Sequence, residues 1–251
     1  MAREWDARTY DRVADPQARW GRAVLDRLPL AGDERVLDAG CGTGRVTELL
    51  AGRLPRGHVV ALDASASMIE AARRRLAPFD DRIEYVVADL GRPLPLADPV
   101  DAILSTATFH WLADHDALFA NLAAVLRPAG RLVAQCGGAG NIASVQRALA
   151  GLGDGWLGPV HFASPLDTAR RLDAAGFVDV ECWLTDEPTR FEPGEPFETF
   201  LRTVILGAHL DRLPAGERDA FVRAVADRLP EPVIDYVRLN VVARRSGRPS
   251  P

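Results

Sequence analysis

The sequence predicts an α/β fold: a doubly wound, mostly parallel seven-stranded sheet with helices on both faces and an antiparallel edge strand. Apolar runs of strand length alternate with helical segments from Val36 to Gln135, which is the pattern of a parallel sheet. The first run passes directly into a glycine-rich turn, as buried strands do before a nucleotide-binding helix. Right-handed crossovers then place helices on both faces, and ligands bind at the carboxyl ends of the strands.

Residues 1–30 precede the first predicted strand and carry aromatic and aliphatic side chains at helical spacing, from Trp5 to Leu28. One or two amphipathic helices are expected, ending at Pro29. Taken alone, the aromatic side chains of this segment are expected to pack on the core.

The first strand, Val36–Ala39, leads into glycines at positions 40, 42 and 44. Glycine accepts positive φ and lets a ligand lie against the main chain, and the amides of such a turn attract negative or polar groups. A dinucleotide fold requires a further glycine where Arg45 stands, so this spacing disfavours a pyrophosphate. The carboxylate of Asp38 favours a positively charged ligand, and S-adenosylmethionine carries both an ammonium and a sulfonium.

The run D-A-G-C-G-T-G at residues 38–44 resembles the first motif of the class I S-adenosylmethionine-dependent methyltransferases, and the family's further motifs follow in order over about residues 34–136. The resemblance implies that Asp63 accepts the two ribose hydroxyls and that Asp89 accepts from the adenine amino group. Taken alone, an aspartate at a strand end is more often a helix cap or a turn former. The implied cofactor is S-adenosyl-L-methionine, with S-adenosyl-L-homocysteine as product, and the implied cofactor-binding residues are Tyr10, Gln17, Asp38, Ala39, Gly40, Gly42, Asp63, Ala64, Met68, Ala88, Asp89, Leu90 and Ser105.

Thr106–Trp111 follows the fourth predicted strand directly, at the place where the family presents the methyl group. His110 is therefore a candidate catalytic residue that either removes a proton or hydrogen-bonds an acceptor carboxylate. A packing role in the core is the alternative for this aromatic segment. Arginines such as Arg202 either clamp an anionic acceptor or face solvent. The expected acceptor-pocket residues are Trp5, His110, Trp111, Trp156 and His209.

The alternating pattern ends at Gly137–Asn141. The residues beyond it predict a helix over 166–175, a strand over 177–184, helices over 197–210 and 217–229, and a last strand over 234–243. We expect a single domain with a helical lid at 1–30, a cofactor-binding half at 31–136, a substrate half at 137–243 with a helical cap inserted before the last strand at about 188–230, and a disordered tail at 244–251.

The amino-acid composition limits the classes of molecule that this protein is expected to bind. The formal net charge of -5 argues against nucleic acid, and no apolar run approaches the about 18 residues of a membrane span, so we expect a cytoplasmic protein with a small-molecule acceptor. The oligomeric state stays open. The three cysteines lack metal-ligand spacing, so no metal site is expected. All basic residues other than histidine are arginine, which excludes lysine chemistry.

Three functions are compatible with these patterns. Within the family, Phe109–His115 and the segment from Trp5 to Trp20 look most like the trans-aconitate 2-methyltransferase group, which implies O-methylation of a carboxylate. A carboxylate is ionised at neutral pH and needs no general base. The alternatives are a secondary-metabolite O-, N- or C-methyltransferase, whose acceptor usually needs a base, and a non-catalytic module that binds S-adenosylmethionine.

Overall fold

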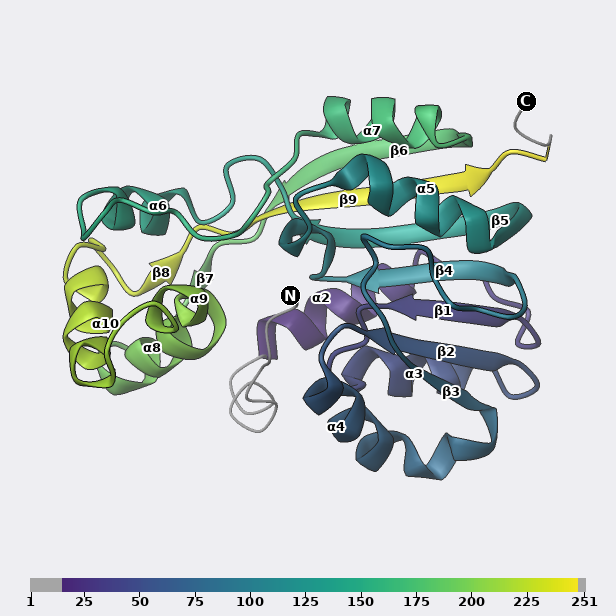
Figure 1. The fold of residues 1–251 in the computed structure, drawn as a ribbon, viewed down its shortest axis with the longest axis horizontal. Helices are drawn as coiled ribbons and strands as arrows, with labels where there is room; N and C mark the ends of the chain where they lie inside the picture. Colours follow the sequence, from purple (N-terminus) through teal and green to yellow (C-terminus); the bar gives the residue numbers. More distant parts are fainter. Residues whose placement is uncertain (1–14, 248–251) are drawn as a thin grey trace.

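The computed structural model describes residues 15–247, in which a seven-stranded sheet has a group of helices beyond one end (Figure 1). The strands lie in the order β3-β2-β1-β4-β5-β9-β6, which confirms the predicted doubly wound arrangement. Their bounds are β1 Arg35–Ala39, β2 His58–Asp63, β3 Ile83–Val87, β4 Val100–Thr106, β5 Leu126–Gly137, β6 Phe177–Asp186 and β9 Val237–Arg245.

All pairings from β3 to β5 are parallel, and β9 is antiparallel to both β5 and β6. The antiparallel strand therefore lies one place inside the edge, and β6 forms the edge itself. The prediction of a disordered tail from residue 244 is wrong for its first two residues, because β9 continues through Arg245. Arg244 pairs with Arg131 of β5, and Arg245 pairs with Phe177 of β6, so both neighbours extend the ladder.

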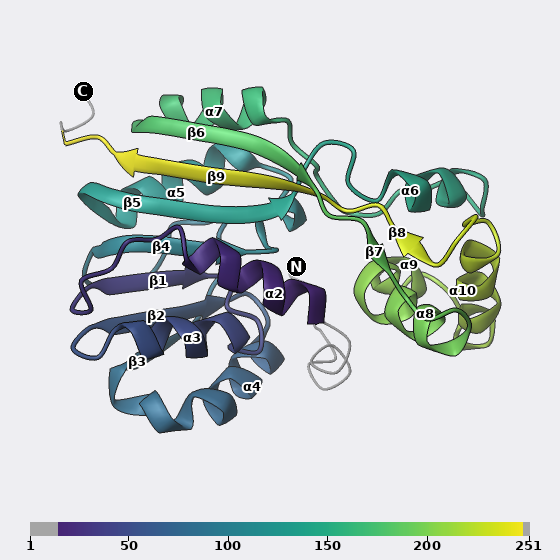
Figure 2. The same cartoon turned by 180° about the vertical axis from the view of Figure 1, so that it is seen from behind.

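Helices cover both faces of the sheet, as predicted (Figures 1 and 2). One face packs against α2 Asp15–Leu25, α3 Arg45–Arg53 and α4 Ala66–Leu76, and the other against α5 His115–Val125 and α7 Pro165–Ala174. Ser65 is the N-cap of α4, since its Oγ accepts from the amide of Met68 at 3.4 Å.

The connection between β6 and β9 holds the helical insertion of residues 188–230, which we call the cap. It contains β7 Thr189–Arg190, α8 Glu195–Phe200, the π-helical turn η3 Leu201–Ile205, α9 Gly207–Leu210, the 3-10 turn η4 Ala215–Glu217 and α10 Arg218–Ala226, and it is followed by β8 Val233–Ile234. The remaining elements are α6 Ala143–Ala150 and the 3-10 turns η1 Ala77–Arg82 and η2 Phe109–Trp111.

Two predicted elements of this half are divided in the structure. The helix expected over 197–210 is interrupted by η3, where the amide of Leu206 reaches back to the carbonyl of Leu201 at 2.7 Å. The strand expected over 234–243 breaks after Ile234 because the side chain of Asp235 binds the start of α6. Its Oδ2 accepts from the amide of Ser144 at 2.9 Å at the start of α6.

A separate apolar core joins the cap to α6 and α2. Phe197, Phe200 and Val222 of the cap are buried in it together with Val145 of α6 and Trp20 of α2. Among residues 15–247, none of the helices has both the length and the apolar character that a bilayer crossing requires.

Candidate cofactor and acceptor site

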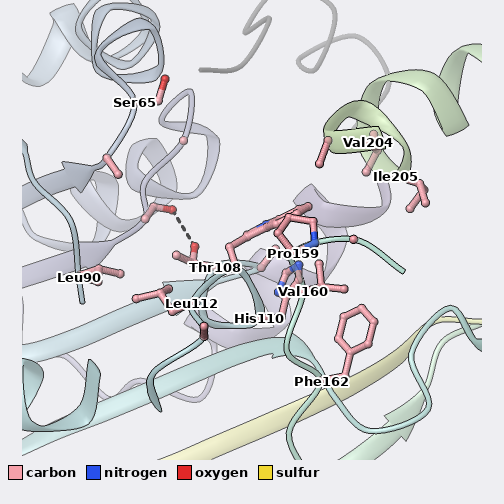
Figure 3. Close-up of a pocket in the computed structure, with 18 of the residues that line it drawn as sticks. Ser65, Leu90, Thr108, His110, Leu112, Pro159, Val160, Phe162, Val204 and Ile205 are labelled. Carbon is pink, nitrogen blue, oxygen red and sulfur yellow. Dashed lines mark hydrogen bonds between the residues drawn. The ribbon is translucent and has the colours of Figure 1, made fainter. Parts of the chain in front are cut away.

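A cavity of about 640 Å³ lies between the carboxyl ends of the strands and the cap. Figure 3 shows Val204 and Ile205 of the cap opposite Ser65 and Leu90 at the strand ends, with His110 between them. The cavity therefore has two ends. We call the end formed by the residues after β1, β2 and β3 the cofactor end, and the end formed by the cap, β9 and the segment 137–163 the acceptor end.

The glycine turn after β1 forms one wall of the cofactor end. Gly40 and Gly42 line the cavity and have φ of 88° and 53°. A Cβ built on Gly40 would lie 2.1 Å from Oγ1 of Thr108, so no other residue fits without moving the segment after β4. The Cβ position of Gly40 is thus filled by Thr108, whereas a Cβ on Gly42 would have nothing within 4 Å, so the main chain of the turn faces open space at Gly42.

Asp38 lies beneath this turn and has no exposed surface. Its Oδ2 accepts from Oγ1 of Thr47 at 2.7 Å, and within residues 15–247 its Oδ1 has no hydrogen-bond partner. Burial raises the pKa of Asp38 to about 7. A buried carboxylate oxygen without a partner fits a ligand ammonium group.

Asp63 ends β2 and lines the cavity, with both carboxylate oxygens held by the main chain. Its Oδ2 accepts from the amide of Gly42 and its Oδ1 from the amide of Ser65, each at 2.9 Å. A carboxylate oxygen accepts more than one hydrogen bond, so this fixed pair also fits two vicinal hydroxyls.

The far wall of the cofactor end comes from the segments after β2 and β3. Ala64, Met68, Ala88, Asp89 and Leu90 all line the cavity, and Met68 and Leu90 are buried. The Oδ1 of Asp89 accepts from the amide of Gly91 at 2.9 Å, which holds the carboxylate at the rim. An apolar slot with an acceptor at its rim fits an adenine ring and its amino group.

Five of the predicted cofactor residues are not among the residues that line the described cavity: Asp38, which is fully buried beneath the glycine turn, Ala39, Ser105, Tyr10 and Gln17. Ser105 donates from Oγ to the carbonyl of Ala39 at 2.6 Å, so both residues brace the strand ends behind the wall. Tyr10 lies outside the described residues, as do Trp5 and the side chain of Gln17.

His110 lies in η2 at the junction of the two ends and is 8% exposed. The amide of Gly137 donates to its Nδ1 at 3.4 Å, which places the ring hydrogen on Nε2. Burial, reinforced by the positive charge of Arg238, lowers the pKa of His110 to about 3. The imidazole is therefore neutral and is better suited to donate a hydrogen bond than to take up a proton.

The other expected acceptor residues have different positions. Trp111 lines the cavity with its ring 5.0 Å from that of His110. His209 of the cap also lines it, and its Nε2 contacts the carbonyl of Trp156 at 3.0 Å. The Trp156 ring does not line the described cavity. It lies at a tilt against His209, with the ring centroids 4.8 Å apart, and under the guanidinium of Arg212, 4.3 Å away.

Sequence reasoning missed Arg238 of β9, which lines the acceptor end although it is only 3% exposed. The sequence did contain a signal, because this arginine stands within the apolar pattern of the last predicted strand. A charged side chain in such a strand is not expected to face solvent. Arg202, the arginine that the sequence suggested, pairs with Asp219 at 2.7 Å and does not line the described cavity. Phe162 and Asn141 line the same end and were also missed.

The cofactor end thus offers a fixed acceptor pair and an apolar slot, which fit the ribose and adenine of S-adenosylmethionine. The unpaired carboxylate oxygen of Asp38, which fits the ammonium group, lies buried beneath the glycine turn and behind this lining. Within residues 15–247 no group of three or more histidine, cysteine, aspartate or glutamate side chains is arranged to hold a metal ion.

Comparison with known proteins agrees with this geometry. Residues 36–130 match the family described as Methyltransferase domain. The YcgJ protein of Bacillus subtilis has a similar fold, with a TM-score of 0.68 and 15% identity over 91% of this chain and 98% of that chain. A trans-aconitate 2-methyltransferase of Variovorax paradoxus is 29% identical over 91% of this chain and 90% of its own length.

A second relative carries the argument from fold to family. A trans-aconitate 2-methyltransferase of Methylobacterium radiotolerans is 31% identical over 97% of this chain and 99% of its own length. The similarity therefore includes the cap and the acceptor end as well as the glycine turn. With the cofactor end built for S-adenosylmethionine, this chain belongs to the trans-aconitate 2-methyltransferase family of class I S-adenosylmethionine-dependent methyltransferases.

Proposed function

We propose that this enzyme methylates a carboxylate oxygen of a small acid such as trans-aconitate, in the cytoplasm. The observation that carries the proposal is the state of His110, the candidate base at the end of β4. Its Nδ1 accepts from Gly137 and its pKa is about 3, so it is a poor base for a hydroxyl or amine acceptor. The three cysteines are free thiols, which fits a reducing compartment.

The chemistry requires no proton transfer when the acceptor is a carboxylate. Bound S-adenosylmethionine supplies a methyl group on a positively charged sulfur. A carboxylate oxygen, already ionised at neutral pH, provides the electron pair for the new C–O bond while the S–C bond breaks, and the two opposite charges cancel. A site that excludes water favours a reaction that removes charge.

The chain's own residues provide binding, orientation and exclusion of water. We assign the ribose hydroxyls to Asp63 and the ammonium to Asp38, which fixes where the methyl group lies. The Nε2 hydrogen of His110 donates to the acceptor and orients it. Val204 and Ile205 of the cap supply the apolar wall that keeps water from the reacting atoms.

We propose the same division of labour for the chain as a whole. Residues 31–136 bind the cofactor, residues 137–243 bind the acceptor, and the cap closes over both. Residues 1–30 act as a lid, an assignment that the packing of Trp20 edge-on against Tyr236, 5.0 Å away, supports at the end of this segment.

The test combines binding with turnover. Calorimetric titration with S-adenosylmethionine, S-adenosylhomocysteine and NAD is expected to show binding of the two adenosyl ligands alone, and Asp63→Ala is expected to weaken it on the order of 100-fold because several charge-assisted bonds are lost. Asp81→Ala, at an exposed acid of η1, is the control. Binding of NAD alone would overturn the cofactor assignment.

Turnover identifies the acceptor. The enzyme is incubated with trans-aconitate, a phenol or an amine of similar size, and the methylated products are separated and identified by mass spectrometry. A methyl ester of trans-aconitate is the expected result, formed with saturating S-adenosylmethionine at a rate that is independent of pH between about 6 and 9. Methylation of the phenol or amine only, with a rate that rises as the pH rises, would contradict the proposal.

A further inference from the structure

Arg238 brings a positive charge to the acceptor end of the cavity. Among the described residues that line the cavity it is the one arginine, and the chain has no lysine. It is buried in the wall, with the guanidinium 4.5 Å from the ring of Trp20. A planar guanidinium presents paired donors that match the two oxygens of a carboxylate, so this position fits an anionic group of a ligand.

A buried hydrogen-bond network fixes the orientation of this guanidinium. The Nε of Arg238 donates to Oε1 of Gln135 on the neighbouring strand β5, at 3.4 Å. The Nε2 of Gln135 donates to Oδ1 of Asn240 at 2.8 Å, and the same oxygen accepts from Nη1 of Arg27 at 2.6 Å. Because Asn240 offers its oxygen to both donors, Gln135 must turn its own oxygen toward Arg238.

The network continues on the other side of Asn240 and reaches the sheet edge. The Nδ2 of Asn240 donates to Oγ1 of Thr185 on β6 at 3.1 Å and to the carbonyl of Arg238 at 3.2 Å. Because a carbonyl only accepts, the second bond settles which end of the amide is the nitrogen. Gln135 and Asn240 are both buried, so their bonds are not exchanged with water. Arg27, Asn240 and Gln135 are thus positioning residues for Arg238.

The other walls of the acceptor end are mostly apolar. Phe162, Val204 and Ile205 line it, and His110 is neutral because burial and the positive charge of Arg238 both lower its pKa. A carboxylate entering this end therefore meets one fixed positive group in surroundings of low polarity, where an ion pair is stronger than in water.

We propose that Arg238 binds a carboxylate of the acceptor that is not itself methylated, and that it thereby makes the enzyme selective for acids with two or more carboxylates. This inference rests on the proposed function. A guanidinium paired with a carboxylate draws electron density from both of its oxygens, which makes each of them a weaker nucleophile for the methyl group. The carboxylate on Arg238 is therefore the second one, and the first is left to His110.

The experiment compares trans-aconitate with crotonate, which has a single carboxylate, in the wild type, Arg238→Met and Arg245→Met. Arg245 is the matched control, because it lies at the other end of β9 and donates to the carbonyl of Gly176 at 2.9 Å away from the cavity. Loss of a buried charge partner is expected to raise the KM for trans-aconitate on the order of 100-fold in Arg238→Met. The kcat for trans-aconitate and the KM for crotonate should change by less than about threefold.

An equal loss on both acids, or no loss on either, would overturn the proposal and leave the carboxylate methyltransferase intact. Calorimetric binding of trans-aconitate in the presence of S-adenosylhomocysteine separates the two claims further. Binding that depends on Arg238 without ester formation would support the subsite and contradict the proposed function. Binding that is unchanged in Arg238→Met would contradict the subsite whatever is methylated.

A second variant covers the case in which Arg238→Met does not fold. Gln135→Glu keeps the guanidinium but places a carboxylate against its Nε, so it is expected to compete with the acid and to raise the KM for trans-aconitate at least about tenfold. Its affinity for S-adenosylhomocysteine should stay within about threefold of the wild type. Unchanged selectivity between the two acids in a folded Gln135→Glu would count against Arg238.

Discussion

The cofactor end and the acceptor end of one cavity are built on different principles. The cofactor end is made of main-chain groups and side chains that directly follow strands: Gly40 after β1, Asp63 at the end of β2 and Ala88 after β3. The acceptor end takes His110 from η2, Phe162 from a loop, Val204 from the cap and Arg238 from β9. Recognition at the first end depends on local backbone geometry, and at the second on long-range packing.

This difference determines which residues tolerate substitution and which do not. A residue of the glycine turn is fixed by the conformation of its own segment, so a single methyl group disturbs it. A residue of the acceptor end is held by partners from distant segments, so its substitution changes affinity for one ligand and leaves the fold of the other end unaffected. Three predictions test the comparison.

The largest effect is expected from Gly40→Ala. The added Cβ meets Thr108 at 2.1 Å and the residue must keep a φ of 88°, so we expect affinity for S-adenosylmethionine to fall on the order of 100-fold by calorimetry. Adding Thr108→Gly should recover about tenfold, because it relieves the clash and leaves the backbone strain.

Gly140→Ala is the matched control at the acceptor end. Gly140 has a similar φ of 84°, but a Cβ there would meet only Val237, at 3.8 Å. Its affinity for the cofactor should stay within about threefold of the wild type. Equal losses in both variants would show that strain alone matters and that the close approach at Gly40 does not.

A smaller effect on cofactor affinity is expected when a fall in pH protonates Asp38. Because its pKa is about 7, protonation removes the charge that pairs with the ammonium, and the Kd for S-adenosylmethionine should rise roughly 20-fold between pH 7.5 and pH 5.5. Asp38→Asn should bind weakly with no such dependence. A wild-type Kd that is constant over this range would remove Asp38 from the cofactor site.

The same carboxyl group affects stability with the opposite dependence on pH. The folded state holds the proton up to about pH 7 and the unfolded state only to about pH 4, so stability present at low pH is lost as the pH rises through 7. Thermal unfolding of the ligand-free protein should show this decline, and Asp38→Asn should abolish it.

The smallest effect is expected from His110→Gln, which keeps a donor and removes the imidazole. If His110 only donates a hydrogen bond, kcat on trans-aconitate should fall by about fivefold or less, and the pH profile should keep its shape. A loss of more than about 100-fold would be the size expected for a general base, and would overturn the role assigned to the neutral ring.

The sequence predicted best where one segment determines its own structure. The end of the first strand at Ala39 follows from the glycines directly after it, and the structure has it where it was expected. The placement of Asp63 at the cavity follows from the same local pattern, since β2 ends at that residue.

Prediction from the sequence failed where contacts with a distant segment determine the local structure. The break after Ile234 depends on α6, whose first turn uses the carboxylate of Asp235, and nothing near Asp235 in the sequence indicates this. The continuation of β9 to Arg245 depends on two neighbouring strands. The burial of Arg238 depends likewise on Trp20, which lies more than two hundred residues earlier in the chain.

The cap leaves and re-enters the sheet at adjacent points. Asp186 at the end of β6 pairs with Val237 at the start of β9, and just beyond them Arg190 pairs with Val233 in the ladder of β7 and β8 (Figure 1). The inserted segment therefore starts and finishes side by side, and its length is nearly independent of the sheet, since lengthening a loop with fixed ends costs little free energy. A related chain can exchange this whole insertion for a longer or shorter one and acquire a different acceptor, while the machinery that presents the methyl group is inherited unchanged.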